Sequence, residues 1–176
     1  MDAILNNIRK KFKITDVIQQ RNDLVFVGID REQAVSLVTY LRDHERFSHF
    51  VLLAAVDWIE KGSFQLTYIL HNHDIKRDLG ISILIPREGP VMESAHHLWE
   101  QVATYQRELY EMFGIEFPGS PGLTEQFLLE GWDDVPPMRR EFDTMKYSEE
   151  TYFPRPGRKT NKPKEYMRKK LYPDDE

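Results

Sequence analysis

Histidines are the side chains of this 176-residue chain that are best suited to bind a metal ion. The chain has six, namely His44, His49, His71, His73, His96 and His97. His71 and His73 stand two residues apart, a spacing that puts both imidazoles on one face of a strand, where they can bind a transition metal. His96 and His97 are adjacent, and on a helix they would point about 100° apart. Because no third ligand is evident, we favour polar residues that close a strand, with a free-standing metal-dependent enzyme using His71 and His73 as the alternative.

Two pairs of adjacent acids, Asp133-Asp134 and Glu149-Glu150, are candidates for acid–base catalysis. Such catalysis needs two carboxyl groups whose surroundings separate their pKa values, and nothing in the sequence around either pair does so. The chain also lacks the G-x-S-x-G, P-loop and G-x-G-x-x-G motifs. Without cysteine it can form no disulfide, thiolate zinc site or iron–sulfur cluster. We therefore expect no catalytic residue, no cofactor and no metal in this chain.

Charge and hydropathy restrict the possible partners. The longest apolar run, Phe50–Val56, is seven residues long, whereas a membrane span needs about 20. The N-terminus has no basic segment followed by an apolar stretch, so no secretory signal is expected. The net charge of −5 argues against bulk nucleic-acid binding, although residues 154–170 carry +7 and leave −12 for the rest. For this basic segment we favour an acidic protein or a membrane surface, with nucleic acid as a further alternative.

The spacing of apolar residues predicts the elements that must position these side chains. Alternating or continuous apolar runs predict strands at Ile14–Gln19, Leu24–Ile29, Phe50–Trp58, Phe64–Leu70 and Leu79–Ile85. The run Phe50–Trp58 is typical of a central strand buried on both faces. Helical spacing predicts a helix over 4–12, a second after Asp30 with a capping box to Gln33, and a third of about 20 residues from Ser94 to Gly114. Residues 1–116 thus form an α+β domain, a mixed or antiparallel sheet packed by about three helices.

Residues 117–176 differ in composition from the rest of the chain. They hold eight of the ten prolines, which disfavours continuous helix or central strand. They also hold many aromatic residues, which a solvated tail would lack. We therefore expect a long, irregular C-terminal arm that docks on a partner. Phe117, Phe127 and Trp132 should pack back on the domain, and the chain from about Tyr147 onward should become ordered only against neighbouring proteins.

The run Q-R-E-L-Y-E-M-F-G-I-E-F-P-G at 106–119 is the most informative stretch. It precedes G-W and P-P-M-R-R-E-F within 131–142, and it follows A-V-D at 55–57 and F-Q-L-T-Y at 64–68. Together these segments resemble the thirty-kilodalton subunit of respiratory complex I, the NADH:quinone oxidoreductase, in which E-R-E-x-Y-D-x-F-G-I-x-F-x-G-H-P is typical. The resemblance runs from about residue 24 to 142.

The resemblance implies a cofactor-free scaffold subunit in the hydrophilic arm of a complex I-like, ion-translocating complex that passes electrons from NADH or a related donor to quinone. Iron–sulfur clusters and flavin, or a nickel–iron site, are then expected in partner subunits. The closest partner would be the large subunit related to the hydrogenase large subunit, with the assembly peripheral to the cytoplasmic face of the membrane. The residues that the motif assigns to partner contact are Arg107, Glu108, Tyr110, Phe113, Gly114, Phe117, Gly119, Pro121, Trp132, Arg139 and Arg140.

Three positions depart from the family pattern. Gln106 replaces the leading Glu, Ser120 replaces the His, and L-T-E-Q at 123–126 replaces a basic segment. A small residue at 120 resembles relatives in membrane-bound nickel–iron hydrogenases and in ferredoxin- or F420-linked complexes, so the same role in such a complex is the alternative. The motif also has purely structural explanations. Arg107 and Glu111 can pair along a helix for a few tenths of a kcal/mol, and Gly114 can end that helix.

Overall fold

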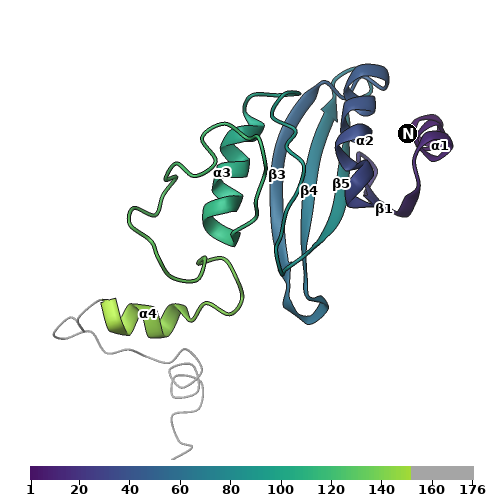
Figure 1. The fold of residues 1–176 in the computed structure, drawn as a ribbon. Coiled ribbons are helices and arrows are strands. Elements are labelled where there is room, and N and C mark those ends of the chain that lie inside the picture. The colour runs from purple at the N-terminus through teal and green to yellow at the C-terminus, as the bar shows by residue number, and fades with distance from the viewer. Residues whose placement is uncertain (152–176) are drawn as a thin grey trace, which may run out of the picture. The chain divides into compact units, whose positions relative to one another are not determined.

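Within residues 1–151, which the computed structural model describes, five strands form one mixed sheet (Figure 1). They are β1 (Ile14–Arg21), β2 (Leu24–Ile29), β3 (His49–Trp58), β4 (Ser63–Asn72) and β5 (Arg77–Pro86). Their order is β1-β2-β5-β4-β3, with β2 and β5 parallel and the other neighbours antiparallel. The predicted α+β class and all five predicted strands are confirmed.

One face of this sheet is buried and the other is more open, because β4 and β5 alternate apolar and more exposed side chains. The buried face carries Phe64, Leu66, Tyr68, Leu70, Leu79, Ile81, Ile83 and Ile85. On the open face, Leu84 and Val56 are exposed. The expectation that β3 is a central strand buried on both faces is wrong, since β3 lies at the edge of the sheet.

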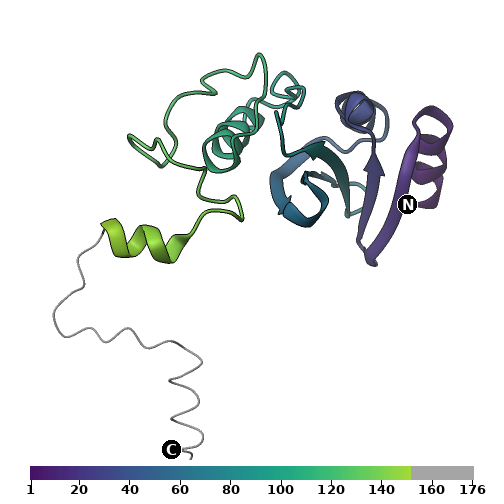
Figure 2. The same cartoon turned by 60° about the horizontal axis from the view of Figure 1, so that its bottom comes forward.

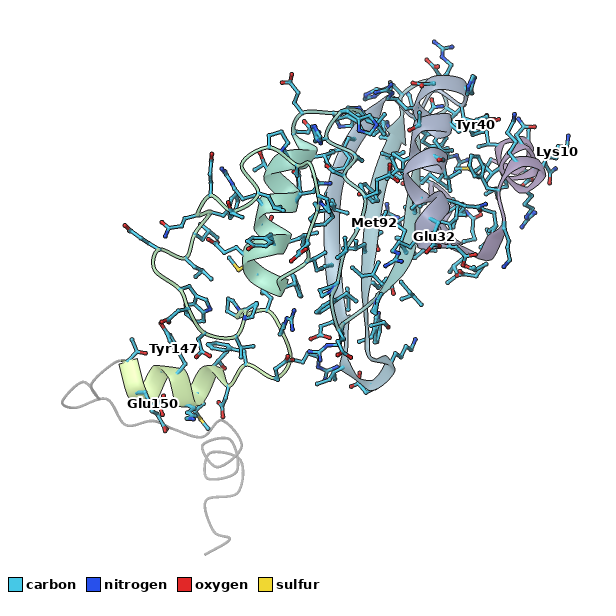
Figure 3. All side chains as sticks on the ribbon, viewed as in Figure 1. Lys10, Glu32, Tyr40, Met92, Tyr147 and Glu150 are labelled. Atoms are coloured by element: carbon cyan, nitrogen blue, oxygen red, sulfur yellow. The ribbon has the colours of Figure 1, made fainter. Side chains whose placement is uncertain are left out.

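Within the sheet domain, α2 (Arg31–His44) packs against β5, and α3 (Val102–Phe113) packs against β3 (Figure 2). The α2 helix buries five apolar residues, Ala34, Val35, Leu37, Val38 and Leu41. The α1 helix (Asp2–Lys11) packs beside it, where the Phe12 ring lies 5.6 Å from the Tyr40 ring. Figure 3 shows Tyr40 on the side of α2 that faces α1. The predicted capping box of α2 does not form, because the Gln33 side chain accepts a hydrogen bond from the Lys13 backbone N–H instead.

The α3 helix (Val102–Phe113) is shorter than predicted. Tight turns precede it, with the Val102 N–H bonded to the Trp99 carbonyl, so Ser94 does not cap the helix. The Ser94 hydroxyl instead lies 2.7 Å from Oε1 of Gln106. Gln106 is fully buried in the helix stripe next to Leu109, although the sequence pattern assigned only apolar residues to that stripe.

Side chains from the first turn of α3 and from the segment before it cover the outer edge of β3. Three side-chain donors, Trp99 Nε1, Gln101 Nε2 and the Tyr105 hydroxyl, bond to the carbonyls of Ser48, Phe50 and Val51. An uncovered strand edge would offer these carbonyls to another chain. The requirement to reach the edge of β3 therefore explains why residues 94–101 are not helical.

Residues 117–142 belong to the sheet domain, since the chain divides into two compact units after Phe142 and not after residue 116. Phe117 is fully buried and Phe127 is half-buried, as expected. The second unit begins at Asp143 with α4 (Thr144–Thr151), a helix that was not predicted and that contains no proline. The basic segment 154–170 and most of the chain from Tyr147 onward lie outside the described residues. No helix within 1–151 has both the length and the hydropathy to span a bilayer.

Candidate functional site

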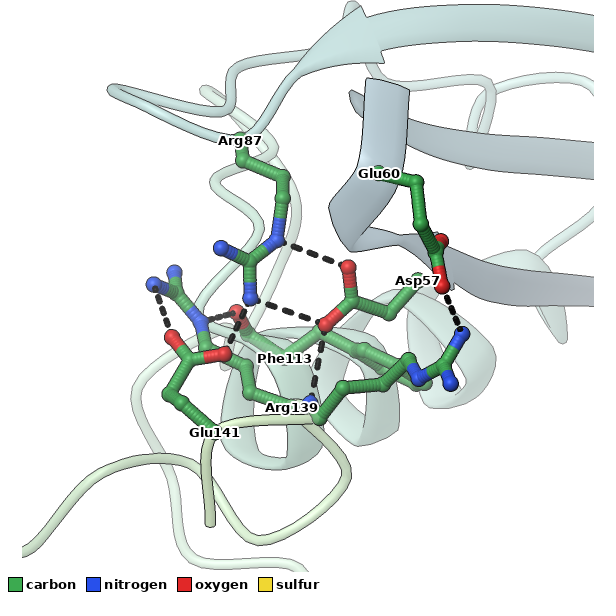
Figure 4. A network of polar contacts seen from close by, with 7 residues as sticks. Asp57, Glu60, Arg87, Phe113, Arg139 and Glu141 are labelled. Atoms are coloured by element: carbon green, nitrogen blue, oxygen red, sulfur yellow. Dashed lines mark hydrogen bonds and ion pairs between the residues drawn. The ribbon is translucent and has the colours of Figure 1, made fainter. Parts of the chain in front are cut away.

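Asp57, near the end of β3, is a nearly buried carboxylate whose side chain is 2% exposed. Its two oxygens accept hydrogen bonds from Nε and Nη2 of Arg87, at 2.7 and 2.9 Å. The Arg140 backbone N–H donates a third bond at 2.9 Å (Figure 4). Burial alone would raise the pKa of Asp57, but the Arg87 hydrogen bonds, the Arg140 N–H and the charges of Arg87 and Arg139 outweigh it and lower the pKa.

Further charged side chains extend this contact into what we call the charge network, formed by Asp57, Glu60, Arg87, Arg139, Arg140 and Glu141. Arg87 also pairs with Glu141, and Arg140 pairs with Glu60 at 3.0 Å. The guanidinium groups of Arg87 and Arg139 both lie over the Phe64 ring, about 5.5 and 5.3 Å from its centre. The network joins the ends of β3 and β5 to residues 139–141, which are far apart in the sequence.

The same downstream segment completes the C-terminus of α3. Gly114 adopts a left-handed conformation, with φ 70° and ψ 31°, which confirms the predicted helix end. The Phe113 carbonyl accepts a 2.7 Å bond from Nε of Arg139, and the Met112 carbonyl accepts a 3.0 Å bond from the Met138 N–H. These are carbonyls that an α-helix leaves without an internal partner, and a cation suits the negative end of the helix dipole.

Glu111 has a role that sequence reasoning missed. Its carboxylate accepts backbone N–H bonds from Phe127 at 2.8 Å and Leu128 at 2.7 Å. Burial raises the pKa of Glu111, but these N–H groups, that of Leu129 and the nearby Arg107 charge lower it overall. Glu111 thus holds the 127–129 loop against α3. The Arg107–Glu111 ion pair, which was the structural alternative for this part of the motif, does not form within residues 1–151, where Arg107 pairs with Glu125. Nothing in the sequence indicates that Glu111 would bind the 127–129 loop.

Arg107 and Glu108 lie on the outer side of α3, away from the buried stripe. Nη1 of Arg107 lies 3.3 Å from Oε2 of the exposed Glu125, and its guanidinium lies 5.4 Å from the centre of the Phe127 ring. Its buried Nε has no hydrogen-bond partner within residues 1–151. Glu108 and Tyr110 are half-buried, and in the described part of the chain neither side chain makes a hydrogen bond or ion pair.

The other predicted contact residues differ in how deeply the structure buries them. Phe113 and Phe117 are buried in the core, so packing accounts for their types. Gly119 and Pro121 are exposed on either side of the buried Ser120. Trp132 is half-buried, with Nε1 3.0 Å from the Asp134 carbonyl and its ring 5.4 Å from that of Phe142.

Two other features lie apart from α3. His49, which the sequence spacing did not link to His71 and His73, is in ring contact with both, and those two rings are also in contact. No three His, Asp or Glu side chains within residues 1–151 are arranged around one point as ligands. A groove of about 920 Å³ lies along β1, β2 and β5 on the open face of the sheet, and none of the residues that the motif assigns to partner contact lines it.

We expect replacement of Asp57 by Ala to lower the free energy of unfolding by about 3 kcal/mol, because it leaves the largely buried Arg87 charge without its main partner. Glu60→Ala is the matched control, since its pair with Arg140 is exposed and contributes at most about 1 kcal/mol. Urea denaturation of both variants measures the difference. Equal losses would show that Asp57 is not the centre of the network.

The lowered pKa of Asp57 also determines how its contribution to the stability of the fold changes with pH. The stabilisation from its ionised form is complete above the ordinary value of 3.8 and is lost as pH falls through the lower folded-state pKa. The gap in melting temperature between the unmodified chain and Asp57→Ala should therefore narrow below that pH.

Gly114→Ala tests the contact between α3 and residues 136–139. A Cβ at Gly114 would lie 2.9 Å from Nη2 of Arg139, while one at Gly131, with nearly the same φ of 68°, would meet nothing within 4 Å. Both variants should lose about 1–2 kcal/mol from the left-handed conformation. Gly114→Ala should lose more, because Arg139 must move. Equal melting temperatures for the two variants would contradict this packing.

Comparison with known proteins identifies the family. A profile described as "Respiratory-chain NADH dehydrogenase, 30 Kd subunit" matches residues 27–148. A subunit of the F(420)H(2) dehydrogenase of Methanosarcina mazei is 25% identical over 115 residues, covering 65% of this chain and 73% of that protein. The membrane-bound hydrogenase subunit beta of Pyrococcus furiosus is 26% identical over 149 residues, covering 80% of this chain and 84% of the relative.

A solved structure has the same fold. It is a chain of a membrane-bound sulfane sulfur reductase, described as an archaeal respiratory membrane complex, and it matches with a TM-score of 0.76 and 19% identity over 92% of this chain and 95% of that one. The profile match includes Asp57, all of α3 and the segment that completes its C-terminus. This chain belongs to the family of the 30-kDa subunit of respiratory-chain NADH dehydrogenase.

Proposed function

We propose that the chain is a cofactor-free scaffold subunit in the hydrophilic arm of a complex I-like, ion-translocating oxidoreductase that passes electrons from NADH or a related donor to quinone. Its family and the names of its relatives as subunits of dehydrogenase and hydrogenase assemblies support this role. Its main partner is then the large subunit related to the hydrogenase large subunit, beside other hydrophilic-arm subunits. Flavin, iron–sulfur clusters or nickel–iron belong to those partners, and the chain lies peripherally on the cytoplasmic face of the membrane without binding nucleic acid.

The observation that carries this proposal is the outer side of α3. A half-buried carboxylate such as Glu108, without a partner in the described chain, has lost part of its hydration and gained nothing in return. The adjacent Arg107 has a buried Nε in the same condition. A neighbouring subunit that offers a donor to Glu108 and an acceptor to Arg107 would satisfy both through charge-assisted hydrogen bonds. We therefore place the docking surface on Arg107, Glu108 and the half-buried Tyr110.

The charge network supports a structural role for the rest of the site. Each of its charged side chains already has a partner within the chain, so the network fixes the position of residues 139–141 and of the C-terminus of α3. Such fixed geometry suits a docking platform, because a preorganised surface loses less conformational entropy on binding.

Ser120 favours a second candidate, the same role in a membrane-bound nickel–iron hydrogenase or in a ferredoxin- or F420-linked relative. Its side chain is buried, where the resemblance to complex I expects the larger histidine. The hydrogenase and F(420)H(2) dehydrogenase relatives point the same way.

Purification of the tagged chain in mild detergent from its native cells tests the proposal. Nickel and hydrogen uptake in the recovered assembly would indicate the hydrogenase type, whereas flavin with NADH-dependent quinone reduction would indicate the complex I type. Iron, flavin or nickel retained in stoichiometric amount by the folded chain alone would contradict the cofactor-free role.

Glu108→Gln should lower incorporation into that assembly about tenfold or more, since a lost hydrogen bond to a charged group costs about 1.5–3 kcal/mol. The melting temperature of the isolated chain should not change, because Glu108 has no partner within residues 1–151. Quantitative mass spectrometry of the purified assembly measures the incorporation.

Glu100→Gln provides the matched control, since Glu100 is exposed just before α3 and loses the same charge. Equal incorporation of Glu108→Gln and Glu100→Gln would place the docking surface elsewhere. A melting temperature lowered only in Glu108→Gln would mean that Glu108 serves the fold.

A further inference from the structure

Two exposed apolar side chains are attached to the last turns of α3 through their own backbone. Leu128 is 71% exposed and Met138 is 57% exposed. The Leu128 N–H donates to Oε2 of Glu111 at 2.7 Å, and the Met138 N–H donates to the carbonyl of Met112 at 3.0 Å. Because Glu111 and Met112 are adjacent in the helix, the structure fixes both apolar residues beside the same part of α3. We call Leu128 and Met138 the apolar pair.

The apolar pair is continuous with the docking surface on the outer side of α3. Residues four apart on a helix are neighbours on its surface, so Arg107 lies next to Glu111 and Glu108 lies next to Met112. The guanidinium of Arg107 also lies over the Phe127 ring, 5.4 Å from its centre. Figures 1 and 2 show most of the loop after α3 on the side of the helix that faces away from the sheet. Exposed apolar side chains and unsatisfied polar groups therefore share one surface.

The charge around this surface has one sign. Residues 117–138 contain four acidic residues and no Lys, Arg or His. All four are exposed, namely Glu125, Glu130, Asp133 and Asp134. Glu125 lies 3.3 Å from Arg107, whereas the other three form no ion pair within residues 1–151. Charges on two docking proteins attract when opposite and exclude each other when alike, so these acids suit a basic partner surface.

We propose that the docking surface extends to the apolar pair, and that the neighbouring subunit bound there has an apolar patch bordered by lysine and arginine. This inference rests on the subunit role proposed above and states the chemistry of the partner. Burial of the apolar pair supplies association energy, while the acidic border selects the surfaces that can approach. Hydrogen bonds to α3 already hold the loop, so little conformational entropy is lost on binding.

The acidic border also separates this partner from other occupants. In a two-fold dimer each protomer presents the same patch to its partner, so the acidic loops of two copies would face each other and repel. Anionic lipid headgroups and nucleic-acid phosphates carry the same sign of charge and are repelled as well. A basic protein surface is the occupant whose charge complements the loop.

Competition between two differently tagged full chains, expressed together in the native cells, tests the apolar pair. The ratio of variant to unmodified chain in the purified assembly should fall at least about tenfold for Leu128→Ala/Met138→Ala. Its melting temperature should not change, because both side chains are exposed. Ile18→Ala/Leu84→Ala is the matched control, since these side chains are 57% and 55% exposed on the open face of the sheet, and it should compete as well as the unmodified chain. Unchanged incorporation of Leu128→Ala/Met138→Ala would overturn the proposal.

Charge reversal in the same competition tests the chemistry of the partner. Glu130→Lys/Asp133→Lys places two cations against the basic border and should lower incorporation about tenfold. Glu88→Lys/Glu93→Lys reverses two exposed acids outside the loop and should have no effect. Equal incorporation of the two variants would show that the partner surface is not basic.

Two further outcomes separate this surface from the subunit role and from self-association. An unmodified chain that recovers no other protein would contradict the subunit role and this surface together, whereas an assembly that accepts every variant equally would contradict this surface alone. Analytical ultracentrifugation of the isolated chain should show no dimer that depends on the apolar pair. A dimer abolished by Leu128→Ala/Met138→Ala would assign the surface to a second copy and overturn the proposal.

Discussion

The nearly buried carboxylate of Asp57 is the constraint on which the arrangement of the ends of β3 and β5, the C-terminus of α3 and residues 139–141 depends. A charge in that position is tolerated only if hydrogen bonds replace its lost hydration. Arg87 and the Arg140 backbone N–H supply them. Satisfying one carboxylate therefore requires the end of β3, the residue after β5 and a segment more than eighty residues downstream to meet. That requirement draws 117–142, a proline-containing stretch without regular structure, into the sheet domain.

The position of α3 follows from the same constraint. Once Arg140 is fixed at Asp57, its neighbours Met138 and Arg139 lie where they bond to the last carbonyls of the helix. The close approach of Arg139 to Gly114 is possible because Gly114 has no side chain. At the other end, Trp99 and Gln101 bind the edge of β3. The helix is thus held at both ends, and its outer side is presented in one orientation.

Local patterns were enough to predict the five strands, α1, α2 and the end of α3 at Gly114, because each depends on residue periodicity or on a single conformational preference. Features that depend on tertiary contact were missed. The polar Gln106 is buried in α3, and the tendency of Ser94 to cap a helix was overridden by the need to cover the edge of β3. Likewise, Glu111 and the three-histidine cluster bring together partners that only the folded chain places side by side.

Contacts within the chain account for several residues of the family motif, so those residues are no evidence of a partner. Gly114, Phe117 and Arg139 all belong to the motif, yet their residue types are explained by a left-handed helix end, by burial and by a bond to the Phe113 carbonyl. A surface that binds a partner must instead contain groups that the chain itself leaves unsatisfied. Glu108 meets that condition within the described residues, and Arg107 meets it in part. The motif therefore combines a larger set of residues that build α3 into the domain with a smaller set that the helix offers outward, and only the smaller set can determine the partner.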